Sequence, residues 1–167
     1  MPERTAAIAG DTSTSMVRGR WTVPLMVFAG VASVVFTVGT AIHGFVVVTP
    51  GTLERMMVLA DADPSGADGF LTLFRAVGIV YVVGNAVGVL ALRRRPRVWL
   101  FWVIVVVNAT QAVGLVMVPP EMFTAARERF GVAGVLPSLV TDGGAAVVAL
   151  VLLGSLIATG TVWGRAR

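Results

Sequence analysis

The 167-residue sequence contains no cysteine, which excludes disulfides, thiolate catalysis and cysteine-ligated metals. It contains a single histidine, His43, so one chain cannot form a bis-histidine haem site or a multi-histidine zinc site. The phosphate-binding, dinucleotide-binding, HExxH and Gly-x-Ser-x-Gly motifs are also missing. We therefore expect neither a metal nor a cofactor.

Charged residues are scarce, at 13%, whereas hydrophobic residues make up 56% of the chain. Soluble domains carry about a quarter charged residues, and here the deficit falls in long uncharged runs typical of membrane proteins. Lysine is absent, which together with the many alanines, valines and glycines is typical of a GC-rich, for example actinobacterial, genome. The net charge of +4 does not indicate nucleic-acid binding, because the arginines flank the apolar runs, where they act as topology signals.

Four apolar runs predict an all-α integral membrane four-helix bundle over residues 21–163. We expect its helices at about 21–48, 70–92, 98–118 and 137–163, because each run can cross a hydrocarbon core about 30 Å thick. The first run exceeds the roughly 7–15 apolar residues of a signal peptide. Residues 1–20 are predicted to be a flexible cytoplasmic tail, and residues 164–167 a second cytoplasmic tail.

Two longer connections, residues 49–69 and 119–136, carry apolar residues at helical spacing. Each predicts a short amphipathic helix that lies on the membrane interface. Residues 61–68 also resemble the start of a calcium-binding loop, but Thr72 stands where the bidentate glutamate is needed. An acidic turn is the simpler interpretation.

The arginine distribution predicts the orientation in the membrane. With four crossings, one side holds six carboxylates and only Arg55, Arg127 and Arg129. The opposite side is rich in arginine and is expected to be cytoplasmic, so the chain is predicted to be a multi-pass protein of the inner (plasma) membrane. The four tryptophans fall at this side too, where indole rings prefer the interface. The arginines of this side are Arg4, Arg18, Arg20, Arg93, Arg94, Arg95, Arg97, Arg165 and Arg167.

Polar residues interrupt all four runs at a similar depth below the outer surface. Ionisable groups at such depth are costly unless they are paired or hydrated, so they are expected to face one another. We therefore predict a pocket that opens outward, with Arg75 and Asp142 as an ion pair and Tyr81 and Asn85 extending it inward. The expected lining residues are His43, Arg75, Asn108, Gln111 and Asp142.

The proposed chemistry assigns Arg75 to an anionic or carbonyl oxygen of the ligand. His43 and Asp142 would transfer protons, which makes these three the candidate catalytic residues. The candidate ligand-binding residues are Asn108, Gln111, Tyr81 and Asn85.

Structural explanations of the same residues stay open. Arg75 is long enough to reach the headgroups, and Asp142 complements the N-terminus of the fourth helix. A static bridge between these two residues would also fix helix register. His43 is compatible with a core position, and Asn108 and Gln111 with hydrogen bonds between helices.

Two stretches carry a family resemblance. The first helix ends Gly39-Thr-Ala-Ile-His43-Gly44, and the second opens Phe70-Leu-Thr-Leu-Phe74-Arg75-Ala-Val-Gly78, before a glycine-rich apolar run. Together with the architecture over residues 21–163, they resemble the DoxX-like group of small four-helix bacterial membrane proteins. Some members are similar to subunits of quinone-linked oxidoreductases, so the resemblance implies a lipid-soluble or quinone-like ligand.

The leading hypothesis is a membrane protein that binds a small apolar or lipid-like molecule in the outer half of the bilayer. The sequence does not decide whether it is an enzyme; the reactions considered are proton transfer, as in an isomerase or cyclase, and quinone-linked chemistry. The alternatives are a non-catalytic accessory subunit of a larger membrane complex and a protomer of a small transporter. Expected partners are therefore the lipid bilayer, the ligand, and either further copies of the chain or a larger membrane protein.

Overall fold

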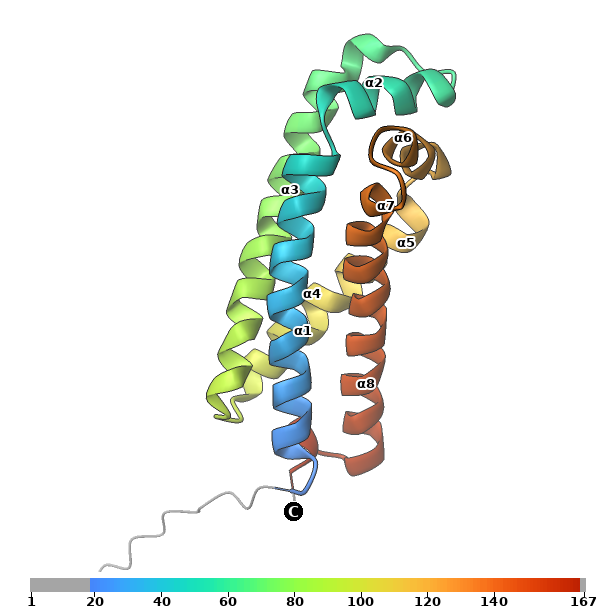
Figure 1. The fold of residues 1–167 in the computed structure, drawn as a ribbon. Coiled ribbons are helices and arrows are strands. Elements are labelled where there is room, and N and C mark those ends of the chain that lie inside the picture. Colours follow the sequence, from blue (N-terminus) through green and yellow to red (C-terminus); the bar gives the residue numbers. More distant parts are fainter. Residues whose placement is uncertain (1–18, 166–167) are drawn as a thin grey trace, which may run out of the picture.

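The computed structural model describes residues 19–165, and these residues form helices joined by short connections (Figure 1). Four segments are long and apolar enough to cross a membrane, as a multi-pass membrane protein requires: Thr22–Val47, Pro64–Arg93, Val98–Met117 and Val132–Thr159. The predicted all-α fold with four long apolar helices is confirmed. The fourth helix begins at Val132 and not at Pro137, because Pro137 lies inside it. Most of the predicted tails, residues 1–18 and 166–167, lies outside the described residues.

Each long segment consists of more than one helical element. The first is α1 (Thr22–Ile42) followed by a π-helix, η1 (His43–Val47). The second combines the 3-10 helix η2 (Pro64–Gly66), α3 (Ala67–Gly88) and the 3-10 helix η3 (Val89–Arg93). The third is α4 (Val98–Ala112) with the single turn α5 (Gly114–Met117). The fourth consists of α7 (Val132–Ser138), a second π-helix, η4 (Leu139–Gly143), and α8 (Gly144–Thr159), and it is followed by the 3-10 helix η5 (Val162–Gly164).

Small residues let the long helices approach closely. A Cβ added to Gly88 of α3 would stand 2.3 Å from the Ser33 hydroxyl of α1, and one added to Gly84 would stand 2.8 Å from the side chain of Val107. Such contacts matter because apolar helices in lipid gain little by leaving it, so close packing stabilises the bundle. Ser33 and the Gly84–Gly88 pair thus lie at close contacts between the long helices.

Two short helices, α2 (Pro50–Leu59) and α6 (Pro120–Phe130), cover one end of the bundle (Figure 1). We call this pair the cap. Thr49 accepts a hydrogen bond from the Thr52 amide and Pro50 occupies the first turn, so α2 begins with a regular N-cap. The apolar faces of α2 and α6 meet in one cluster, and Arg55 donates to Glu128 at 2.7 Å. The two predicted short helices are present and pack against each other, while their position on a membrane interface stays a prediction.

The acidic turn before α3 is a capped turn. Asp63 accepts hydrogen bonds from the amide and the hydroxyl of Ser65, at 2.9 and 2.6 Å. These bonds lower the pKa of Asp63. The described residues contain no group of three or more histidine or acidic side chains able to hold a metal.

The opposite end, which we call the basic end, holds the start of α1, the turn between α3 and α4, and the end of α8 (Figure 1). Trp163 lies at this end, as predicted for all four tryptophans. Its ring, however, is buried and does not face the surface. It is 0% exposed, packs edge-to-face on Phe101 and donates from Nε1 to the Arg97 carbonyl at 2.9 Å. Gly160 in the left-handed conformation ends α8 and turns the chain back over the bundle, which buries this ring.

Candidate functional site

A cavity of about 610 Å³ lies in a fork between α3 and the α4–α5 segment. In Figure 1, α4 starts beside α3 at the basic end and diverges from it toward the cap. The helices still touch where Val107 meets Gly84 and where Asn85 hydrogen-bonds Gln111. Beyond that level the two helices separate and the cavity lies between them. Residues of η1 and η4 also line it, and so do Met56 and Met122 of the cap.

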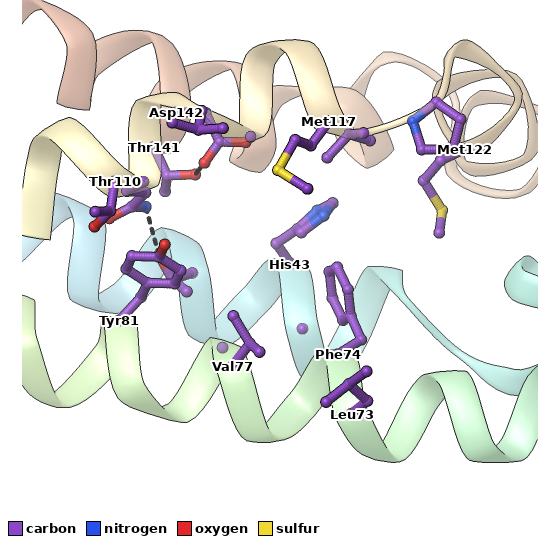
Figure 2. A pocket seen from close by; sticks show the side chains of 18 of the residues that line it. His43, Leu73, Phe74, Val77, Tyr81, Thr110, Met117, Met122, Thr141 and Asp142 are labelled. Carbon is purple, nitrogen blue, oxygen red and sulfur yellow. Dashed lines mark hydrogen bonds between the residues drawn. The ribbon is translucent and has the colours of Figure 1, made fainter.

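The cavity is open on one side. Leu73 of α3 and Met117 of α5 line it and are 65% and 76% exposed, so they stand at its mouth. If the bundle spans a membrane, this mouth opens laterally toward the lipid acyl chains. The cavity walls are mostly apolar, and the polar side chains cluster: Tyr81, Thr110, Thr141 and Asp142 lie toward one end (Figure 2).

Both π-helices supply residues to this cavity. His43 and Gly44 belong to η1, and Thr141 and Asp142 belong to η4. A π-turn inserts one extra residue into a helix, and such turns recur at functional sites. The second turn follows Pro137, which has no N–H and therefore cannot complete the regular hydrogen-bond ladder. Runs of apolar residues carry no signal for such turns.

Asp142 is held by hydroxyl groups of its own helix. Its carboxylate accepts from Ser138 Oγ at 2.8 Å and from Thr141 Oγ1 at 3.2 Å. Gly114 lets α5 pass directly over it, because an added Cβ there would stand 2.9 Å from the carboxylate. The group is thus fixed in place and still faces the cavity.

His43 projects into the fork (Figure 2). Its ring meets the edge of Phe74 with centroids 5.8 Å apart, and its buried Nδ1 has no hydrogen-bond partner in the described part of the chain. A buried polar atom without a partner is uncommon in folded proteins. The ring lines the cavity, but this nitrogen is itself shielded from the open space.

Gln111 joins three helices at the deep end of the cavity. Its Nε2 donates to Thr40 Oγ1 at 3.1 Å and its Oε1 accepts from Asn85 Nδ2 at 2.8 Å. Asn85 itself is buried behind the cavity wall. Tyr81 and Asn85 were predicted to extend the pocket inward, but only Tyr81 and Gln111 line the cavity, and Asn85 does not.

Arg75 lies on a different face of α3. The face toward the cavity carries Phe74, Gly78 and Tyr81, and one helical residue turns the side chain by about 100°. Arg75 instead donates from Nε to the Gly44 carbonyl at 3.3 Å and stands over the Phe45 ring. The predicted ion pair with Asp142 is therefore absent, and Arg75 does not line the cavity.

Asn108 also differs from the prediction. It is buried and donates from Nδ2 to the Ile104 carbonyl of its own helix at 2.8 Å, outside the cavity lining. Of the five residues expected to line the pocket, the structure brings together His43, Gln111 and Asp142. The catalytic and binding roles assigned to these residues stay predictions.

Several lining residues were not anticipated from the sequence. They include two threonines, two phenylalanines and two methionines: Thr40, Thr110, Phe70, Phe74, Met117 and Met122. The aromatic pair was recognisable, because Phe70, Phe74 and Tyr81 follow helical spacing on one face. The methionines had no distinguishing signal, since apolar residues occur all along these runs.

No protein-family model, curated protein or solved structure matches this chain. The functional assignment therefore depends on the geometry of the cavity.

Proposed function

We propose that this protein binds a small apolar or lipid-like molecule in the cavity between α3 and α5. The observation that carries the proposal is a cavity of about 610 Å³ with apolar walls, a lateral mouth and a few clustered polar groups. This combination is typical of small-molecule sites, in which polar groups orient a ligand held by apolar contacts. Membership of the DoxX-like group, and with it a quinone-like ligand, stays part of the proposal.

The proposal places the bundle in the plasma membrane with the basic end in the cytoplasm. Arg93, Arg94, Arg95 and Arg97 at that end support this orientation through the positive-inside rule. The cap and the cavity would then belong to the outer half of the bilayer. A ligand would enter from the acyl chains through the mouth beside Leu73 and Met117.

The lining supports a ligand with an uncharged polar head. No arginine lines the cavity, while Asp142 accepts hydrogen bonds and Tyr81 and His43 offer further polar atoms. An anionic head would meet the Asp142 carboxylate with no arginine in the cavity lining, which is unfavourable away from water. A hydroxyl group suits the site better, because it donates to Asp142 and accepts from Tyr81 or His43. If a reaction occurs there, His43 and Asp142 are the proton-transfer candidates.

A blocking substitution with a matched control tests the proposal. Gly78 lines the cavity and Gly69 lies on the same helix outside it, and a Cβ added at either position has no neighbour within 4 Å. Gly78→Leu should fill the cavity, and Gly69→Leu should leave it open. Both variants and the parent chain would be purified in mild detergent and exposed to a photoreactive long-chain alcohol, and labelled residues would be located by mass spectrometry.

We expect labelling near Met117 and Met122 in the parent chain and in Gly69→Leu, and its loss in Gly78→Leu. The corresponding long-chain carboxylic acid should label more weakly, and Asp142→Asn should reduce this preference. Equal labelling of all three proteins would refute the proposed pocket. Co-purification of a stoichiometric protein partner without pocket labelling would favour the accessory-subunit hypothesis.

A further inference from the structure

A second hollow, of about 390 Å³, lies at the basic end of the bundle. Its lining combines three arginines, Arg93, Arg95 and Arg97, with apolar surface from Leu90, Trp99 and Leu100. It is separate from the cavity described above, which lies toward the cap. None of these arginines lines that cavity.

The backbone explains why these three arginines share one hollow. Helix η3 ends at Arg93, and Arg94 adopts the left-handed conformation with φ of 54°, so the chain leaves the helix at that point. Residues 94–97 are not helical, and the Arg97 amide donates to the Arg95 carbonyl at 2.8 Å, so a tight turn holds these two arginines close together. Arg94 is missing from the lining, although it stands between two lining residues.

The turn is held from behind by the C-terminal segment. Trp163 Nε1 donates to the Arg97 carbonyl at 2.9 Å, and Arg165 donates to the Pro96 carbonyl. These contacts fix the backbone that carries the arginines, which lowers the entropic cost of ordering them around a ligand. The hollow also lies at the start of α4, which has no side-chain cap and so presents free N–H groups.

None of the three lining guanidiniums has a carboxylate within salt-bridge distance among residues 19–165. Three like charges on one short turn repel one another unless an anion lies between them. Guanidinium groups match phosphate oxygens in geometry, and the apolar side of the hollow suits the glycerol and upper acyl region of a lipid.

We infer that Arg93, Arg95 and Arg97 form a binding site for the phosphate group of an anionic phospholipid. The inference depends on the bundle lying in a bilayer with this end at the lipid surface, and it is independent of any ligand in the apolar cavity. Basic hollows at helix ends on the cytoplasmic side are suited to such headgroups.

Arg94 supplies a matched control for the test. Arg95→Gln and Arg94→Gln remove the same charge from adjacent exposed positions, but only the first removes a lining group. The full chain and both variants would be studied in nonionic detergent by native mass spectrometry and by thermal unfolding. The probes are phosphatidylglycerol, phosphatidylcholine and inorganic phosphate.

We expect phosphatidylglycerol to bind the parent chain and Arg94→Gln alike, and Arg95→Gln about tenfold more weakly, as loss of one charged hydrogen bond predicts. Equal weakening in both variants would show diffuse attraction to net charge and would overturn the inference. Equal binding of phosphatidylcholine would also overturn it. Stabilisation by inorganic phosphate as strong as that by phosphatidylglycerol would identify a free-anion site and overturn the lipid assignment.

Discussion

The hydrogen bonds of Gln111 allow a quantitative test of how the deep end of the cavity is built. Gln111→Met keeps the length and approximate volume of the side chain but removes its bonds to Asn85 and Thr40. Asn85 is 1% exposed and its Oδ1 already lacks a partner, so its whole carboxamide would then be unpaired. The substitution therefore affects a buried neighbour as well as the mutated residue.

The magnitude follows from the cost of an unpaired buried amide. In proteins generally this cost is about 1–3 kcal/mol, and interhelical bonds within membranes average about 0.6 kcal/mol with a maximum near 1.7 kcal/mol. We expect Gln111→Met to lower the free energy of unfolding by about 1–2 kcal/mol. Replacing Asn85 by leucine as well removes the unpaired group, so the double variant should lose less than the sum of the single variants, with a coupling of about 0.6–1.7 kcal/mol.

The assay is a double-mutant cycle. The four proteins would be unfolded in mixed micelles with increasing dodecyl sulfate, and helix content followed by circular dichroism. If the loss in the double variant equals the sum of the two single losses to within about 0.5 kcal/mol, Gln111 and Asn85 do not share a buried hydrogen bond. The proposed hydrogen-bonded arrangement at the deep end of the cavity would then be wrong.

Three further predictions concern the stability of the folded protein. Each is tested by thermal unfolding in detergent unless another assay is named. Gly88→Ala should destabilise the protein by about 1–3 kcal/mol through overpacking, while Gly78→Ala, with open space around it, should stabilise α3 by about 0.5–1 kcal/mol. The Arg55 hydrogen bond lowers the pKa of Glu128, so the stabilisation by this pair is complete above the ordinary glutamate pKa and is lost as pH falls through the lowered pKa. Amide exchange of α2 should therefore become faster at acid pH in the parent chain relative to Glu128→Gln, in which this pH-dependent change should be absent. Trp163→Phe should cost about 1–3 kcal/mol, because it removes the Nε1 hydrogen bond to the Arg97 carbonyl and leaves space where the larger indole ring is buried.

The long helices and the cap helices were predictable because they depend on run length and on amphipathic spacing. An apolar run long enough to cross a membrane can form little else, and the apolar positions of α2 and α6 repeat with helical period. The end of α8 was harder to predict. Gly160 and the left-handed Trp163 reverse the chain, and only the assembled bundle reveals the space that this indole fills.

The rotational position of the polar residues was not predictable from depth alone. His43, Arg75 and Asp142 were placed together because they share a level, but a level does not specify a direction around the helix axis. In a soluble helix the polar face would supply that direction. In a membrane helix both lipid and core are apolar, so the sequence of α3 did not reveal that Phe74 faces the cavity while Arg75 lies about 100° away.

The two π-helices bear on whether the polar groups serve packing or a ligand. A bundle stabilised only by helix contact has no need of irregular turns, which sacrifice regular hydrogen bonds in a solvent that cannot replace them. Here η1 and η4 carry His43 and Asp142, and both line the same cavity. A purely structural role would favour pairing these groups with each other or with a cation, yet Asp142 is held by hydroxyls of its own helix and His43 keeps an unpaired nitrogen. Asp142 therefore faces the cavity with no arginine in the lining, as the proposed binding of a molecule with an uncharged polar head would require.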